Sequence, residues 1–260
     1  MPKNILQNTY LYLLGYRDNL SLMYAEIFNQ LMKLMRPFMK AQGFTSRGNN
    51  FYKRHPEGNI GIINFQKNRD GFPRFTVNVG IYSVVLAKYF LAEFNQKTVK
   101  EYPSLGDYHW ESRIVSLVPV QNPARQGDED WRKFGDKWWW YDDSTNVEQL
   151  FKEISRLIMD FGIPAIEQRI TDKQLIEDIL SYKTKNLESW EELHWLLLKN
   201  LSVLYKTSGE IEQLESIMRH FKKVLEKDPS DKVVKRHLDK LRETRDEQSI
   251  PINPPKKMKP

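Results

Sequence analysis

The feature that most constrains this chain is a change in the spacing of its apolar residues. Between residues 20 and 38 they recur at three- and four-residue steps, which predicts an amphipathic helix that ends near Gly43. From residue 51 to 83, and again from 108 to 120, the spacing becomes two, which is typical of strands. Helical spacing returns from about Asn146. A helix, then strands, then several helices together predict an α+β fold.

The expected elements follow from these patterns and from the turn residues between them. We expect strands at 51–55, 60–68, 75–83, 108–120 and 138–141, with short connections that favour an antiparallel sheet. A helix is expected at 84–94. Another is expected to begin at a capping box formed by Thr145 and Glu148, to pack on the sheet and to end at Gly162 and Pro164. Further helices follow to residue 245, with the first two opened by Thr171 with Gln174 and by Ser189 with Glu192. The predicted organisation is an α+β domain (1–168), a helical appendage (169–247) and a disordered basic tail (248–260).

Composition excludes several classes of protein. The 260 residues contain no cysteine, which excludes thiolate catalysis, cysteine-ligated zinc and iron–sulfur clusters. No apolar run approaches the roughly 20 residues of a membrane helix, and no secretory signal is visible, so we expect a cytoplasmic protein with no membrane partner. Residues 33–74 hold nine basic and two acidic side chains, whereas 101–143 hold five basic and nine acidic ones. Opposed charges of this kind steer a partner into register.

Strand alternation defines the candidate binding residues. It places Asn64 and Gln66 on one face of their strand and Asn78 on one face of the next, and Arg113 joins them from a later strand. Amide and guanidinium groups bind carboxylates, phosphates or peptide backbone through directed hydrogen bonds. The alternative interpretation is the ordinary solvent-facing side of an antiparallel sheet. Two basic residues complete the predicted binding set: Arg54 and Lys67.

Several segments together resemble a known family. They are Pro37-x-x-Lys40-x-x-Gly43-Phe44, Asn50-Phe51-Tyr52, the strands at 63–67 and 75–82, Trp110-x-x-Arg113 and Trp138-Trp139-Trp140. In order and spacing, over about residues 23–180, they resemble the domain of unknown function 4304 family. The resemblance implies a compact bacterial α+β protein. It implies no activity and no cofactor.

No catalytic or metal-binding signature is present. The sequence lacks a glycine-rich phosphate loop, H-E-x-x-H and G-x-S-x-G. Asp107, His109 and Glu111 share one face of a predicted strand, but a salt-bridged strand with Arg113 explains them more simply than a metal site. We therefore assign no catalytic residue, no metal ligand and no cofactor. An enzyme with an unrecognised carboxylate or amide site remains the alternative.

Aromatic residues suggest two further alternatives. In a strand, Trp138 and Trp140 lie on one face and Trp139 and Tyr141 on the other, either packed under the following helix or exposed as an anchor for a partner. The basic region 33–74 also contains rings that stack on bases in nucleic-acid-binding proteins: Phe51, Tyr52, Phe72 and Phe75. Our leading hypothesis is a non-enzymatic bacterial protein that binds a protein partner, of the immunity or antitoxin kind. Nucleic-acid binding is a further alternative.

Overall fold

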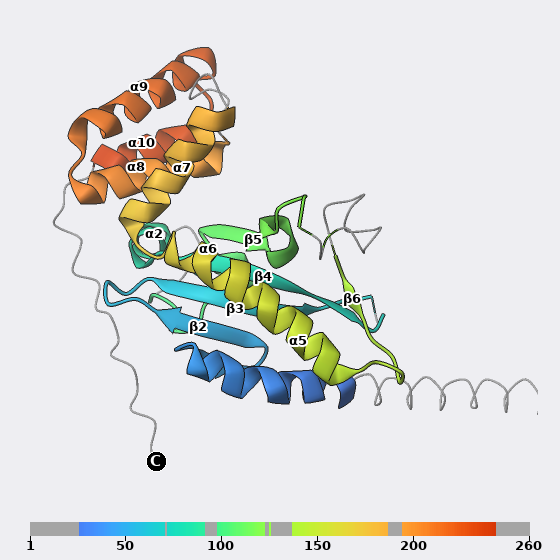
Figure 1. The fold of residues 1–260 in the computed structure, drawn as a ribbon. Helices are drawn as coiled ribbons and strands as arrows, with labels where there is room; N and C mark the ends of the chain where they lie inside the picture. The colour runs from blue at the N-terminus through green and yellow to red at the C-terminus, as the bar shows by residue number, and fades with distance from the viewer. Residues whose placement is uncertain are drawn as a thin grey trace, which may run out of the picture. The chain divides into compact units, whose positions relative to one another are not determined.

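The computed structural model describes residues 26–70, 72–91, 98–122, 125, 137–186 and 194–242, without the side chains of 183–186 (Figure 1). A six-stranded antiparallel sheet has the strand order β1-β2-β3-β4-β5, and β6 pairs with β4. The strands are β1 (Thr45–Arg47), β2 (Asn50–Arg54), β3 (Ile60–Lys67), β4 (Arg74–Tyr82), β5 (Trp110–Arg113) and β6 (Trp139–Trp140). The α+β fold class is therefore confirmed.

The helical elements begin with a helix at 26–41. After it come α2 (Val84–Phe90), the 3-10 turns η1 (Leu105–Asp107) and η2 (Ile114–Leu117), and α5 (Val147–Leu157). The chain continues through a π-helical turn, η3 (Ile158–Gly162), into α6 (Ile163–Glu167), α7 (Asp172–Asn186), α8 (Trp195–Ser208), α9 (Ile211–Lys227) and α10 (Lys232–Arg242). The expected tail at 248–260, the first residues of the first helix and the expected start of a helix at Ser189 lie outside the described residues.

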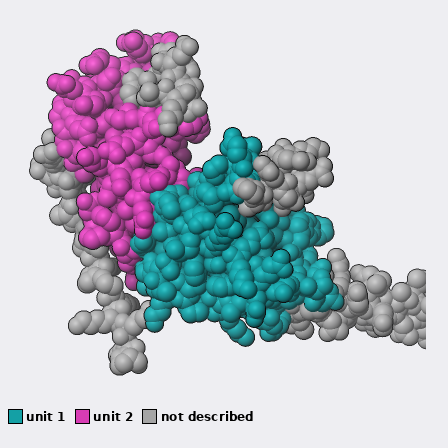
Figure 2. Space-filling view, in the orientation of Figure 1, with its two compact units in different colours: residues 1–53, 62–79, 112–165 teal, residues 54–61, 80–111, 166–260 magenta. Residues whose placement is uncertain are grey.

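The chain forms two compact units (Figure 2). The first comprises residues 1–53, 62–79 and 112–165, and the second comprises residues 54–61, 80–111 and 166–260. The chain crosses between the units inside β2, β3, β4 and β5 and again after residue 165. The segments 54–61 and 80–111 thus belong with the C-terminal helices rather than with the rest of the sheet strands.

The first unit is built around one apolar face of the sheet. Phe75 lies at its centre, with ring centroids 5.4 Å from Phe28, 5.9 Å from Phe65 and 5.7 Å from Trp139. Phe28 belongs to helix 26–41, and Phe38 of the same helix packs edge-on against Phe151 of α5 at 5.8 Å. Helix 26–41 and α5 therefore lie side by side on this face (Figure 1). Helix 26–41 ends at Gly43, whose φ of 83° allows Phe44 N–H to bond the carbonyl of Met39.

The expected strand at 108–120 is wrong for most of its length. The strand is limited to β5, and residues 114–117 form the 3-10 turn η2. Ile114, Val115 and Val118 are all buried, which is the spacing of a helical turn rather than of a strand. A strand would have placed Ile114 and Val115 on opposite faces, whereas the turn buries both.

Both ends of the expected helix at 145–162 also differ. Asn146 rather than Thr145 caps α5, because its side-chain oxygen accepts a hydrogen bond from Gln149 N–H at 3.0 Å. Gly162 and Pro164 do not end the helix. The π-helical turn instead pairs Ile163 N–H with the carbonyl of Ile158, and the chain stays helical to Glu167.

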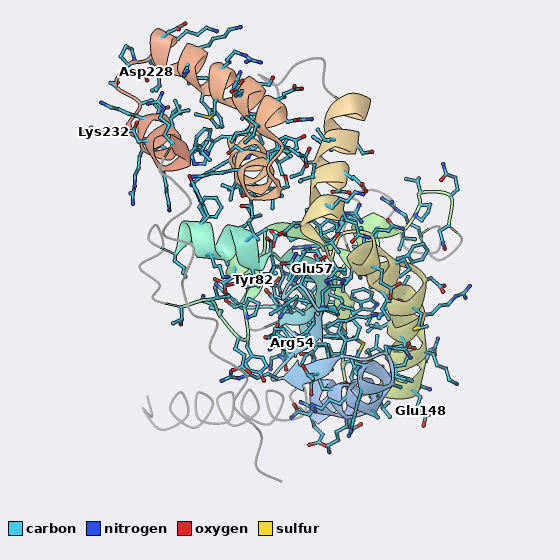
Figure 3. All side chains as sticks on the ribbon, turned by 90° about the vertical axis from the view of Figure 1, so that its left-hand side faces the viewer. Arg54, Glu57, Tyr82, Glu148, Asp228 and Lys232 are labelled. Carbon is cyan, nitrogen blue, oxygen red and sulfur yellow. The ribbon has the colours of Figure 1, made fainter. Side chains whose placement is uncertain are left out.

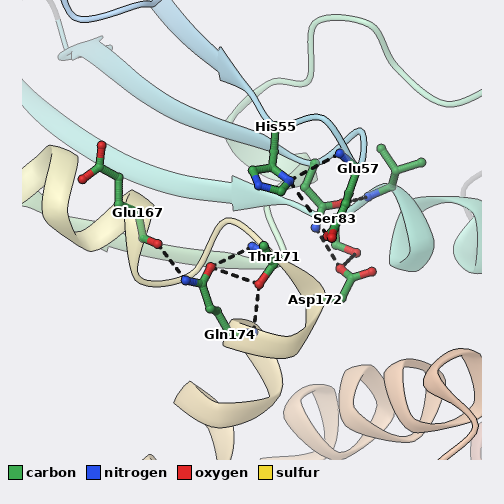
Figure 4. A network of polar contacts seen from close by, with 9 residues as sticks. His55, Glu57, Ser83, Glu167, Thr171, Asp172 and Gln174 are labelled. Carbon is green, nitrogen blue, oxygen red and sulfur yellow. Dashed lines mark hydrogen bonds and ion pairs between the residues drawn. The ribbon is translucent and has the colours of Figure 1, made fainter.

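The second unit joins its strand ends to its helices through a polar network (Figure 4). Asp172, in the first turn of α7, accepts hydrogen bonds from Ser83 Oγ at 2.7 Å and from Asn59 Nδ2 at 2.9 Å. Ser83 also caps α2. Thr171 and Gln174 form the reciprocal bonds of a capping box, as the sequence predicts.

A buried histidine organises the C-terminal helices of the second unit. His237 Nε2 lies 2.9 Å from Ser202 Oγ, and its ring packs edge-on against Trp195 and Phe221. Burial, with smaller contributions from the charges of Lys199 and Lys240, lowers the pKa of His237 to about 3. The imidazole is therefore neutral in the folded protein at neutral pH.

We expect Gly80→Ala to destabilise the protein by about 1–3 kcal/mol. A Cβ at residue 80 would lie 2.2 Å from the Tyr108 ring, so the ring would have to move. Gly106→Ala is the matched control, because a Cβ there meets nothing within 4 Å. Urea unfolding of both variants measures the difference, and equal stability of the two would contradict this packing.

We expect the unfolding free energy to fall as the pH is lowered from about 6.5 towards 3. His237 binds a proton in the unfolded chain in this window but not in the folded protein, so its contribution is present above pH 6.5 and lost below. His237→Phe keeps a ring in the aromatic contacts and removes the titration. The slope of stability against pH should then become shallower by about 1.4 kcal/mol per pH unit. An unchanged slope in denaturant unfolding would be incompatible with a neutral buried His237.

Candidate interaction surface

A row of amide side chains crosses three strands on the sheet face opposite the two helices. Asn78 of β4 donates from Nδ2 to Asn64 Oδ1 at 3.1 Å and to Gln66 Oε1 at 2.9 Å. Asn64 Nδ2 in turn donates to Asn50 Oδ1 at 2.7 Å. Asn78 is only 6% exposed, and Asn64 and Gln66 are half-buried. The structure thus brings these three predicted residues together, with their amides bonded to one another.

Arg74, at the start of β4, lies among aromatic rings. It is paired across strands with Trp140 of β6, so its guanidinium carbon is 4.9 Å from the centre of that ring. The same carbon lies 5.0 Å from the Trp138 ring and 5.7 Å from the Phe72 ring. Three π faces therefore hold one guanidinium in place.

Two of these rings are open to solvent. Trp140 and Phe72 are each 55% exposed, and their ring centroids are 6.0 Å apart. Trp139 and Tyr141 lie on the opposite face and are buried. The alternation predicted for 138–141 is therefore present. Of the two predicted alternatives, Trp139 and Tyr141 pack in the core, whereas Trp140 is exposed to solvent.

Arg113 extends this cluster. Its guanidinium carbon lies 5.1 Å from the Trp138 ring, so Trp138 contacts both Arg113 and Arg74. We call Phe72, Arg74, Arg113, Trp138 and Trp140 the Arg–Trp cluster. All five belong to the first compact unit, as does the amide row.

The other two predicted binding residues lie elsewhere. Lys67 is on the opposite face of β3 from Gln66, with its ammonium 5.3 Å from the Phe28 ring. Arg54, labelled in Figure 3, lies at the end of β2. It belongs to the second unit. Its Nη2 donates to the Glu101 carbonyl at 2.6 Å, and its guanidinium lies over Tyr102. Neither residue joins the amide row or the Arg–Trp cluster.

Most of the aromatic rings that the sequence suggests for stacking on nucleic-acid bases are buried in the core. Phe51, Tyr52 and Phe75 are buried, and of the four rings only Phe72 is exposed. A buried ring cannot stack on a base. The basic region 33–74 therefore presents cations with a single available ring.

The predicted Asp107–His109–Glu111 face does not converge on a shared point. Asp107 bonds Lys100 Nζ at 2.6 Å and the Ser104 hydroxyl at 2.8 Å, and these partners lower its carboxyl pKa against the effect of its burial. His109 Nδ1 accepts from the Ser83 main-chain N–H at 3.0 Å. Among the described residues, no group of three or more His, Asp or Glu side chains is placed to hold a metal ion.

Ser83, His109 and Asp172 have the residue types of a hydrolase triad but not its connectivity. The Ser83 hydroxyl donates directly to Asp172, and His109 bonds the Ser83 backbone rather than the hydroxyl. A nucleophilic serine needs an imidazole that accepts its hydroxyl proton. This arrangement positions α2 and α7 and does not activate Ser83.

The fold and the surface define an α+β protein whose first unit carries an exposed Arg–Trp cluster. A family model, the domain of unknown function DUF4304, matches residues 35–168, and the chain belongs to this family. No curated protein matches the chain, and no solved structure does. None of the described helices is both long and apolar enough to cross a bilayer.

We expect Asn78→Ala to lower the unfolding free energy by about 1–3 kcal/mol, because Asn64 Oδ1 and Gln66 Oε1 lose their shared donor. Gln149→Ala removes an exposed amide from α5 and is the matched control, with an expected change within about 0.5 kcal/mol. Thermal and urea unfolding measure both. A neutral Asn78→Ala would show that the amide row does not hold the strands together.

Proposed function

We propose that this protein is a non-enzymatic binding protein that contacts a protein partner through the Arg–Trp cluster. One observation carries the proposal: Trp140 and Phe72 are half exposed, and both rings contact the guanidinium of Arg74. Tryptophan and arginine are the residues most enriched at the energetic centres of protein interfaces. The Trp140 ring, already held by the cross-strand pair with Arg74, loses little conformational freedom on binding.

The chemistry of the cluster favours a partner with a carboxylate beside an apolar group. Stacking on rings uses the faces of a guanidinium and leaves its in-plane N–H groups as the donors. Arg74 Nη2 already lies 3.8 Å from the exposed carboxylate of Asp70, so a partner carboxylate would share this guanidinium with Asp70 or replace Asp70 there. Arg69 is exposed close by in the sequence, and residues 33–74 are strongly basic. An acidic partner surface with an aromatic or aliphatic side chain fits both features.

The narrower form of the proposal is a cytoplasmic bacterial protein of the immunity or antitoxin kind. Such proteins act by binding a partner and need no catalytic group. The identity of the partner distinguishes this form: recovery of a toxin supports it, and recovery of another kind of protein restricts the proposal to protein binding.

We expect the double substitution Phe72→Ser and Trp140→Ser to weaken partner binding by at least about 10-fold without unfolding the protein, because both side chains are half exposed. Quantitative pull-downs with wild type and variant identify the proteins that depend on the cluster. Calorimetry with the purified partner then gives the change in Kd. Met159→Ser, which alters another exposed apolar side chain of the first unit, is the control.

Three outcomes would overturn the proposal. The double variant retains the same partners with the same Kd, the control loses binding equally, or wild type binds single-stranded oligonucleotides with a steep salt dependence and recovers no protein. The last outcome would favour the nucleic-acid alternative.

A further inference from the structure

A pocket of about 150 Å³ lies within the second compact unit, apart from the Arg–Trp cluster. Residues from the end of β4, α2, the segment 106–109 and α8 line it. Aromatic and apolar groups form most of its wall, together with two polar side chains that the argument below uses: Tyr82, Phe90, Tyr108, Leu196, His109 and Asn200. A cavity of this volume accommodates one aromatic ring.

Asn200 gives the pocket an unmet hydrogen-bonding group. The residue is 2% exposed, and its Oδ1 is buried with no hydrogen-bond partner in the part of the chain that the structure describes. Buried side-chain oxygens almost always have a partner, because leaving one unpaired costs its full desolvation penalty. Because Asn200 also lines the pocket, an acceptor left unpaired among the described residues indicates a donor supplied from outside.

His109 contributes the complementary group. Its Nδ1 accepts the Ser83 N–H, and burial lowers its pKa to about 4 against the opposing effect of Asp107. The neutral imidazole therefore carries its proton on Nε2, which is a donor. Asp107, the carboxylate at the pocket, is bonded to Lys100 and Ser104. Asn200 and His109 thus carry an uncharged acceptor and an uncharged donor, respectively.

We propose that this pocket binds a small, uncharged, planar ring with an amide-like edge. The ring packs among Tyr82, Phe90 and Tyr108. Its N–H donates to Asn200 Oδ1, and its carbonyl accepts from His109 Nε2. Lactams and the amide edges of heteroaromatic bases have this chemistry. The proposal is independent of the protein-binding function, because its residues belong to the other compact unit.

The test is a chemical-shift titration of the full chain with 2-pyridone, a single ring whose N–H and carbonyl are adjacent. We expect saturable shifts at Asn200, Tyr108 and His109, with a Kd on the order of 1 mM for so small a ligand. N-methyl-2-pyridone keeps the ring and the carbonyl but lacks the donor. We expect it to bind about 10-fold more weakly.

A pair of variants locates the recognition. Asn200→Leu has a similar shape and removes an unpaired buried oxygen, so it should fold at least as stably as wild type and lose about 10-fold in affinity for 2-pyridone. Val233→Ala alters an exposed residue of the same unit and should leave the Kd unchanged. The proposal fails if the two pyridones bind equally, if the shifts do not saturate or lie elsewhere, or if Asn200→Leu binds as wild type does.

Discussion

Strand β4 is buried on both faces, and this constraint determines how the first unit is built. Phe75, Val77 and Val79 lie in the apolar layer under the helices, while Thr76 and Asn78 are covered on the other side. A polar side chain without access to water must find protein partners, or its desolvation is not repaid. The amide row provides them for Asn78 through Asn64 and Gln66. Groups that the sequence suggests for binding a ligand are therefore engaged in joining strands.

The proposed recognition surface lies instead where β6 pairs with β4. The pairing of Arg74 with Trp140 and of Phe75 with Trp139 sends one tryptophan inward and one outward. The inward ring stacks on Phe75, which fixes the strand and so fixes the outward ring. Burial on one face thus prepares an exposed and ordered aromatic surface on the other. A surface organised before contact binds with less loss of side-chain entropy.

Local patterns predict the parts of this structure that depend on local physics. Alternation places the strands 50–54, 60–67 and 74–82 within a residue or so, and Thr171 with Gln174 marks the start of α7. Alternation also puts Lys67 opposite Gln66, so its position over Phe28 agrees with the pattern although it separates Lys67 from the proposed binding set. The pairing of β6 with β4 joins distant segments and leaves no local signal. The turn at Ile114 and the π-helical turn after Leu157 likewise depend on tertiary packing, since Ile114 lies against Gly162 at the end of the π-helical turn.

Asn200 raises a different question, because folding alone does not account for it. Its neighbours in α8, Leu198, Leu201 and Leu204, are buried apolar residues, and a leucine at 200 would continue that packing without an unpaired oxygen. The buried Lys199 beside it has its ammonium over the Phe90 ring, and Ser202 bonds His237, so the nearby polar groups each have a structural partner. Asn200 is the exception among them, and it is the one that lines a ring-sized pocket. The proposed ligand would supply the hydrogen bond that the Asn200 oxygen lacks among the described residues, and it would thus account for an amide where a leucine would make the folded state more stable.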